Sequence, residues 1–375
     1  MFSERILIFV GWYSQPCILR IWGSPRKTDP CSTGQHYSRD EHGLQENMSV
    51  SHGENAVLRK IEKFFQGHAA GALRLGIGDD AALVKARPGQ EMILTCDWFL
   101  EGTHFLWEKH PPAAVGWKCL ARAVSDVAAM GGVPRCFLLS LALPARATSE
   151  WLSAFLRGLR RASRFLGCAL AGGDTTRREE PLISITVIGE VRTGRAILRS
   201  EARAGDLLYV TGRLGEAELG LRLLRGGRGI ARAKNAALRK HLYPEPRLEV
   251  GQWLAENRLA SAMMDLSDGL STDLARLCEA SGVGARIWAE RLPVSHRVER
   301  ADGLSMALHG GDDYELLFAV RPGKAKKIPR NYRGLPLTCV GEVVAGTKVF
   351  LEESGQRREF RPGGWDPFRK RQGSG

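Results

Sequence analysis

Short apolar runs that lead into aspartate recur along this chain, and they constrain its fold more than any other feature. Each run has the length of a strand, and three of the acids that follow are Asp97, Asp174 and Asp265. Carboxylates gathered where strands end repel one another unless a cation neutralises them, and clustered oxygen ligands suit Mg²⁺. A fold that brings these strand ends together would therefore form a divalent-metal site.

Each acid also has a plain structural explanation. Gly and Asp are common turn formers, so residues 78–80 alone fit an ordinary loop. Ser267 and Asp268 stand where helix caps belong. Asp126 has the spacing of a surface ion pair with Arg122 on one helix. Taken singly, these residues leave both interpretations open, and only their convergence in space favours a metal site.

The glycines at 76 and 78 imitate a dinucleotide-binding fingerprint, with Asp97 farther along the chain. That fingerprint must open a helix, but the turn at residues 88–89 ends the segment too soon for one. Two aspartates in the same loop would also repel a pyrophosphate. We therefore reject the dinucleotide-binding interpretation of this segment and keep a dehydrogenase only as a third alternative.

Composition and charge are those of a globular protein. The 375 residues are 43% hydrophobic and 25% charged, which allows two domains with sizeable cores. The net charge of +13 lies in scattered arginine-rich patches without a nucleic-acid motif, so we expect no nucleic-acid partner. Eight scattered cysteines without a C-x-x-C pair favour a reducing cytoplasm and argue against a zinc site or a disulfide scaffold.

The first 50 residues differ from the rest. An apolar run at residues 6–10 is soon interrupted by polar residues and Pro16, which argues against a signal peptide or a membrane span. Residues 24–54 are polar and rich in turn formers, a composition typical of disorder. We expect residues 1–50 to be an extension outside the fold.

Hydrophobic periodicity predicts alternating helices and strands from residue 53 onward. The apolar stripes and their breakers predict helices at residues 113–130, 149–165 and 216–224, and strands at residues 135–143 and 182–188. We expect an N-terminal domain at residues 53–198, a C-terminal α/β domain at residues 199–368 and a basic tail at residues 369–375.

No P-loop and no protein-kinase signature occurs in the sequence. If the chain transfers phosphoryl groups, metal-bound carboxylates must do the work that backbone amides and a lysine do in P-loop proteins. Several Mg²⁺ ions with ATP would fit the number of acids.

Seven motifs, in this order, resemble those of the thiamine-monophosphate kinase family. They lie at residues 76–82, 95–105, 124–134, 172–177, 199–206, 265–269 and 310–315. The resemblance covers residues 53–368 and implies a two-domain aminoimidazole ribonucleotide synthetase-like fold of the α/β (α+β) class. It also implies a homodimer formed through the N-terminal mixed sheet, and transfer of the ATP γ-phosphate onto thiamine monophosphate, giving thiamine diphosphate.

By motif position, the resemblance also implies roles for individual residues. The Mg²⁺ ligands would be Asp80, Thr95, Asp97, Asp126, Asp174, Asp265 and Asp268, of which Asp126, Asp174 and Asp268 would be catalytic. The ATP contacts would be Gly173, Asp174, Arg199 and Ser267, and the contacts to the thiamine phosphate would be His104, Asp312 and Trp365. Catalysis would rest on positioning and charge neutralisation.

Three positions depart from the family pattern. Cys96 stands where a hydroxyl residue is usual, Asp312 replaces a glutamate, and Trp365 takes a place more often held by tyrosine. The last two changes bear on substrate preference. Rival functions are another ATP-dependent enzyme of the same superfamily, of the ribonucleotide synthetase or hydrogenase-maturation type, and a non-catalytic nucleotide- or nucleic-acid-binding protein.

Overall fold

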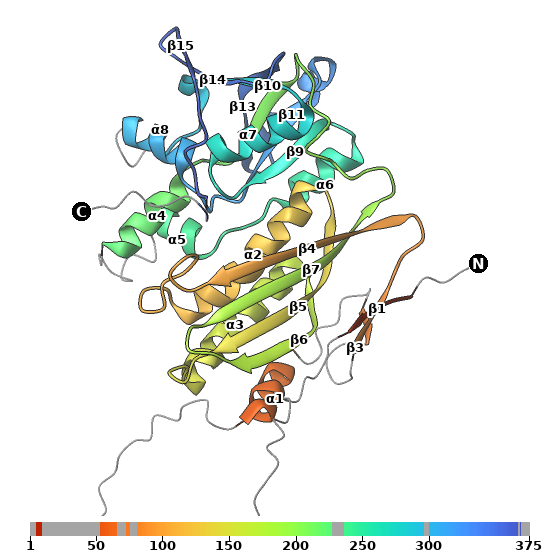
Figure 1. Cartoon of the computed structure of the whole chain (residues 1–375). Coiled ribbons are helices and arrows are strands. Elements are labelled where there is room, and N and C mark those ends of the chain that lie inside the picture. Colours follow the sequence, from red (N-terminus) through yellow and green to blue (C-terminus); the bar gives the residue numbers. More distant parts are fainter. Residues whose placement is uncertain are drawn as a thin grey trace, which may run out of the picture.

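Two α/β halves make up the part of the chain that the computed structural model describes (Figure 1). That part comprises residues 5–9, 53–65, 73–75, 81–226, 236–295, 300–366 and 368. The first half carries a four-stranded sheet and the second an eight-stranded sheet. The predicted α/β class is confirmed, whereas the predicted domain boundaries stay a prediction.

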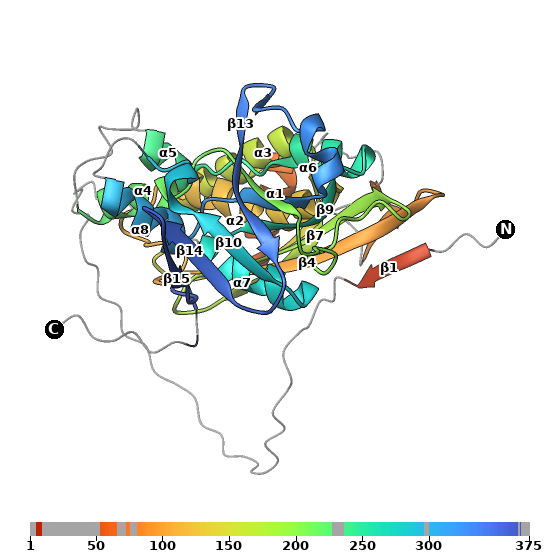
Figure 2. The same cartoon turned by 90° about the horizontal axis from the view of Figure 1, so that it is seen from above.

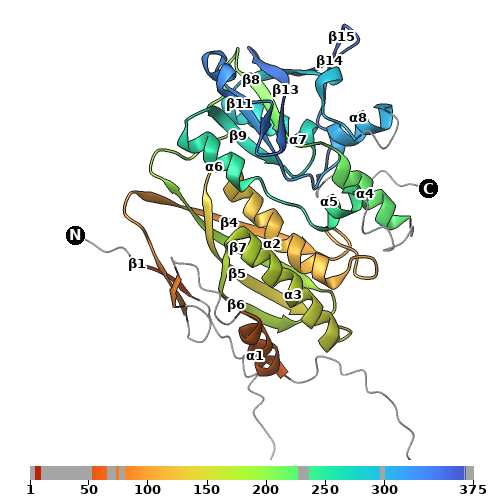
Figure 3. The same ribbon diagram turned by 180° about the vertical axis from the view of Figure 1, so that it is seen from behind.

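The N-terminal sheet has the strand order β4-β7-β5-β6. These strands are β4 (Gln90–Leu100), β7 (Leu182–Arg192), β5 (Val133–Leu143) and β6 (Ala169–Arg177). Helices α2 (Pro112–Ala129) and α3 (Ser149–Leu166) cover one face of it, as Figures 1 and 3 show from opposite sides. Only β5 and β6 run parallel, and α3 makes the crossover between them.

Helices α2 and α3 touch backbone to backbone. A Cβ at Gly116 would lie 2.1 Å from the carbonyl oxygen of Phe155, and one at Gly158 would lie 1.9 Å from that of Ala113. The side chain of Thr148 caps the start of α3, and Gly167 ends it in the left-handed conformation. Gly116 and Gly158 therefore permit a close backbone contact between α2 and α3, and this contact fixes the position of α2 over the sheet.

A small sheet of order β1-β3-β2 lies beside β6. It contains β1 (Arg5–Phe9), β2 (Leu73–Leu75) and β3 (Ala81–Lys85), and helix α1 (Gly53–Phe65) packs nearby. We expected residues 1–50 to lie outside the fold, and for residues 5–9 this was wrong, since they pair antiparallel with β3. This apolar run supplies β3 with a partner strand. The rest of the expected extension lies outside the described residues.

The C-terminal sheet has the order β15-β14-β10-β13-β8-β11-β9, with β12 paired to β13. Figure 2 shows β13, β10, β14 and β15 from above. The strands are β8 (Leu207–Thr211), β9 (Ala260–Leu266), β10 (Gly284–Trp288), β11 (Glu315–Val320), β12 (Asn331–Tyr332), β13 (Leu335–Val344), β14 (Val349–Glu353) and β15 (Gln356–Glu359).

The helices of this half are α4 (Glu216–Arg225), α5 (Ala236–Leu242), α6 (Leu248–Glu256), α7 (Leu270–Ser281) and α8 (Arg300–His309), with 3-10 turns η2 (Ala289–Arg291) and η3 (Pro322–Lys327). One apolar core joins the two halves, because the end of α2 packs with α6, β9 and β11. A Cβ at Gly251 of α6 would lie 2.1 Å from the carbonyl oxygen of Ala128. The last turns of α2 therefore face β9.

Two local expectations were wrong. Asp97 lies inside β4 and Asp174 lies inside β6, whereas both were expected after the end of a strand. β4 pairs with β7 over its whole length, so the ladder continues past the first apolar run. Gly173 packs tightly in the sheet, where a Cβ would lie 1.9 Å from the carbonyl oxygen of Leu139. Its lack of a side chain is explained by this packing.

Candidate active site

A cleft of about 970 Å³ lies between the two halves. Most of the predicted site residues line it, although they come from distant parts of the chain. They are Asp97 of β4, His104, Asp126 of α2, Asp265 of β9, Ser267, Asp268, Asp312 and Trp365. Four of the acids that the sequence predicts to converge, Asp97, Asp126, Asp265 and Asp268, therefore meet in one cleft.

Three of these acids are partly or fully buried, and Asp265 is the most buried of them. Burial raises the pKa of Asp97, Asp126 and Asp265. Neighbouring carboxylates raise each pKa further, whereas the charge of Arg122 lowers it at Asp97 and Asp126. The hydroxyl of Thr95 donates to Asp126 Oδ2 at 2.5 Å, and that of Ser125 donates to Asp265 Oδ2 at 2.6 Å. The cluster is thus costly to ionise by itself, as a cation site is before its ion arrives.

Asp268 lies between β9 and α7, and its charge acts on Asp97. Its carboxylate accepts from Arg276 at 2.5 Å, and its backbone N–H donates to Asp273. The N-cap position of α7 is Gly269, so neither Ser267 nor Asp268 caps the helix. That structural alternative was wrong, and both residues face the cleft instead.

The donor set fits Mg²⁺ only in one particular way. Within the described ranges, no group of three or more His, Cys, Asp or Glu residues stands close enough to hold an ion by itself. Mg²⁺ usually binds one or two carboxylates and completes its octahedron with waters and substrate phosphates. The carboxylates around this cleft could therefore supply one or two ligands to each Mg²⁺, with a bound polyphosphate and waters supplying the others.

The second predicted group, for the acceptor substrate, lies in the same cleft. His104 Nδ1 accepts from the backbone N–H of Leu100 at 2.9 Å. Burial, and then the charge of Arg122, lower the pKa of His104 to about 3, so its ring is neutral at pH 7. The backbone N–H of Trp365 donates to the carbonyl of Asp268, which joins the C-terminal segment to the acid wall.

Asp312 is fixed from two sides. Lys118 Nζ donates to its Oδ2 at 2.8 Å, and the Tyr314 hydroxyl donates to its Oδ1 at 2.7 Å. Although burial alone would raise it, the charges of Lys118 and its neighbours lower the pKa of Asp312 well below its ordinary range. Asp312 also has a positive φ of 69°, a conformation that non-glycine residues rarely adopt.

The supports behind Asp312 are residues that the sequence analysis missed. The Lys118 side chain is 1% exposed, and His241 stands beside it and contacts His110 at 3.1 Å. Burial lowers the pKa of His110 to about 3 and that of His241 well below its ordinary value. Lys118 lies among apolar residues of α2, and this position was the sequence signal that could have revealed the cluster.

The other acids of residues 310–315 have structural roles. Asp313 accepts from the backbone N–H groups of Gly215 and Ala217, so it anchors the start of α4. Glu315 is fully buried and paired with Lys240 and Arg247, which lower its pKa to about 2 although burial alone would raise it. One acid in this motif faces the cleft, and two hold the fold.

Not every predicted ligand joins the cluster. Asp80 lies outside the described residues. Arg199 follows β7 on the surface, close enough to Asp126 to lower the pKa of that carboxyl. Asp174 is exposed on β6. It pairs with Ser140 of β5, which pairs with Ser184 of β7, which in turn pairs with Trp98 of β4. Three strand spacings, about 14 Å, separate Asp174 from β4.

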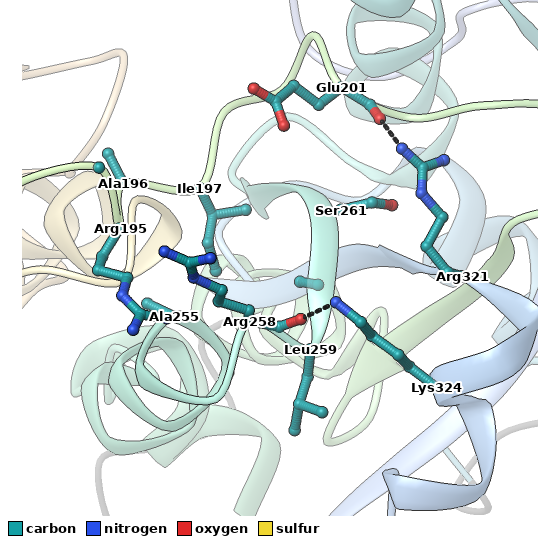
Figure 4. Close-up of a pocket in the computed structure, with 12 residues that line it drawn as sticks. Arg195, Ala196, Ile197, Glu201, Ala255, Arg258, Leu259, Ser261, Arg321 and Lys324 are labelled. Carbon is teal, nitrogen blue, oxygen red and sulfur yellow. Dashed lines mark hydrogen bonds between the residues drawn. The ribbon is translucent and has the colours of Figure 1, made fainter.

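A second, smaller pocket of about 250 Å³ lies where the linker after β7 meets β9 and η3. Arg321 donates to the carbonyl of Glu201 at 3.0 Å, and Lys324 donates to that of Arg258 (Figure 4). None of the predicted site residues lines it. Among the described residues, no helix is both long and apolar enough to cross a membrane.

Comparison with known proteins identifies the family. Residues 78–191 match the AIR synthase related protein, N-terminal domain, and residues 203–353 match the C-terminal domain of the same group. Thiamine-monophosphate kinase of Escherichia coli K12 is 40% identical over 282 residues, which cover 73% of this chain and 85% of that protein.

Two solved structures agree in both fold and sequence. The thiamine-monophosphate kinase of Stenotrophomonas maltophilia K279a superposes with a TM-score of 0.72 at 34% identity, covering 82% of this chain and 99% of that one. AaThiL complexed with AMPPCP and TMP superposes with a TM-score of 0.67 at 33% identity, covering 88% and 99%. This chain belongs to the thiamine-monophosphate kinase family.

Proposed function

We propose that this chain transfers the γ-phosphate of ATP to the phosphate of thiamine monophosphate, giving thiamine diphosphate, in a reaction that depends on Mg²⁺. The observation that carries the proposal is the shared cleft, where Asp97, Asp126, Asp265 and Asp268 face the same space as His104, Asp312 and Trp365. The AaThiL complex supports it, because that relative holds an ATP analogue, AMPPCP, together with TMP.

The proposed roles follow from the position of each side chain. Asp97, Asp126, Asp265 and Asp268 would hold Mg²⁺, with Thr95 and Asp80 as further ligands. Bound Mg²⁺ neutralises the phosphates and keeps the attacking and leaving oxygens in line. Arg199 and Ser267 would contact ATP. Because the acceptor is already an anionic phosphate, the protein needs to position it rather than deprotonate it.

We also propose that the protein acts as a homodimer through the uncovered face of the N-terminal sheet. On that face Leu94 is 66% exposed and Trp98 is 54% exposed, although both are large apolar side chains. Among the described residues, β3 packs against the part of the face near Cys136 and Ile188 through Val84. Since Asp174 shares this face, its proposed roles with Gly173 in metal and ATP binding require the second copy. A cytoplasmic location stays a prediction from the scattered cysteines.

The activity test uses purified protein with ATP, Mg²⁺ and thiamine monophosphate, with thiamine and other phosphate esters as alternative acceptors. Thiamine diphosphate is measured by chromatography. We expect product from thiamine monophosphate alone, and none from the Asp126→Asn variant, whose circular dichroism should match the wild type. Product formation by that variant at the wild-type rate would refute the assigned cluster.

A further inference from the structure

Arg122 of α2 lines the cleft, and the described residues leave its hydrogen bonding incomplete. Its side chain is 13% exposed, and its Nε and Nη1 atoms are buried without a hydrogen-bond partner. Buried N–H groups are nearly always paired in folded proteins. An unpaired guanidinium at the wall of a ligand cleft therefore points to an acceptor that arrives with the ligand.

The protein groups around Arg122 do not satisfy it. Its Nη2 atom lies 3.7 Å from Asp97 Oδ1, which is long for a hydrogen-bonded ion pair. Its guanidinium carbon lies 5.6 Å from the centre of the buried Phe99 ring, which supports the flat group from one side. If Asp97 binds a metal ion, its electrostatic attraction for Arg122 becomes weaker still.

The other basic side chains of the cleft are differently engaged. Arg276 is bound to both Asp268 and Asp273, at 2.5 Å and 3.0 Å. Burial keeps His241 neutral by lowering its pKa. Arg225 lies at the exposed rim, at the last residue of α4. Among the described residues that line the cleft, Arg122 thus combines burial, positive charge and unpaired donors.

The position of Arg122 indicates which anion it serves. Its charge acts on Asp97 in the acid group, and also on His104 and Asp312 in the predicted acceptor group. The acceptor's phosphate must reach the metal at the acid group, while the rest of the acceptor contacts His104 and Asp312. That phosphate therefore lies between the acid group and the acceptor group, where Arg122 stands. Arg122 and Arg199 both lower the pKa of Asp126, so Arg122 acts on the acid group as well as on the acceptor group.

We propose that Arg122 binds the phosphate of the acceptor and so determines the preference for thiamine monophosphate over thiamine. This inference rests on the proposed function and adds a residue to it. A guanidinium presents a planar fork of N–H donors to phosphate oxygens, and it keeps its charge at any physiological pH. The unphosphorylated alcohol offers Arg122 no such partner.

The test compares Arg122→Met, which removes the charge but keeps an unbranched side chain, with Arg122→Lys, which keeps the charge and loses the fork. Arg160→Met is the matched control, because Arg160 of α3 also has an unpaired buried Nε but lies outside the cleft. Calorimetry measures the binding of thiamine monophosphate, thiamine and AMPPCP to each full-length protein with Mg²⁺ present.

We expect Arg122→Met to weaken the binding of thiamine monophosphate by about 10- to 100-fold, which is the usual effect of losing a charge-assisted contact. Thiamine and AMPPCP should bind within about twofold of wild type, Arg122→Lys should fall between, and Arg160→Met should match wild type. If Arg122→Met lost equal affinity for thiamine and thiamine monophosphate, or lost affinity for AMPPCP alone, the assignment would be overturned. Wild-type protein that fails to prefer the phosphate would instead refute the proposed function.

Discussion

The ion pair between Lys118 and Asp312 should be the main electrostatic support of the acceptor side of the cleft. Their charged atoms lie 2.8 Å apart, and the Lys118 side chain is 1% exposed. Two unit charges at that separation attract by about 6 kcal/mol at an effective dielectric constant of 20. Removing one partner of a buried pair typically costs about 3–5 kcal/mol, because the other charge is left without compensation.

For Lys118→Met we expect a loss of unfolding free energy near the lower end of that range, about 3 kcal/mol. The loss is limited because Asp312 is 25% exposed and keeps the hydrogen bond from Tyr314. Methionine retains most of the buried volume, so the change reports charge rather than a cavity. Urea unfolding followed by circular dichroism measures the difference.

A double-mutant cycle separates the pair from its surroundings. Asp312→Asn removes the charge that Lys118 compensates, so the double variant should be less destabilised than the sum of the single variants by about 2 kcal/mol. The control is Arg333→Met, which breaks an exposed pair with Glu249 and should cost less than about 1 kcal/mol. A coupling energy below about 0.5 kcal/mol would refute the claim that Lys118 holds Asp312.

Three further predictions test the helix packing, the buried acids and the ATP side. Gly116→Ala should lower the unfolding free energy by about 2–3 kcal/mol, because its Cβ would meet the Phe155 carbonyl; an unchanged urea midpoint would contradict the packing. Burial raises the pKa of Asp313 to about 7, so its contribution to stability falls as pH rises from about 4 to 7. Asp313→Asn should flatten that part of the pH profile, whereas an unaltered slope would contradict it. Arg199→Ala should raise the KM for ATP more than that for thiamine monophosphate, and equal increases would argue against its assigned role.

The sequence predicted much of the fold because local signals agree with the tertiary structure. Thr148 and Gly167 bound α3, as cap and breaker residues should. The strands were harder to delimit, since β4 and β6 extend through polar residues that pair along the ladder. Hydrogen bonds to neighbouring strands decide such boundaries, and a linear pattern does not contain them.

The site was predictable as a set of residues but not as a geometry. Acids after apolar runs predicted that Asp97, Asp174 and Asp265 would converge, and the cleft contains Asp97 and Asp265 but not Asp174. Asp126, which the family resemblance assigned to the metal site, also lines it. The buried residues Lys118 and Arg122 were missed, because a single basic residue in a predicted helix does not reveal its partners on other elements. Their roles arise from residues nearly 200 positions away, such as Asp312, and only the folded chain shows that proximity.

The central claim is that acids from both halves of the chain hold Mg²⁺ in this cleft. Its most direct test is a crystal grown with Mn²⁺ in place of Mg²⁺, AMPPCP and thiamine monophosphate, measured for anomalous scattering. We predict peaks within about 2.4 Å of carboxylate oxygens of Asp97, Asp126, Asp265 or Asp268. Well-ordered ligands in the cleft with no peak beside any of these carboxylates would contradict the account.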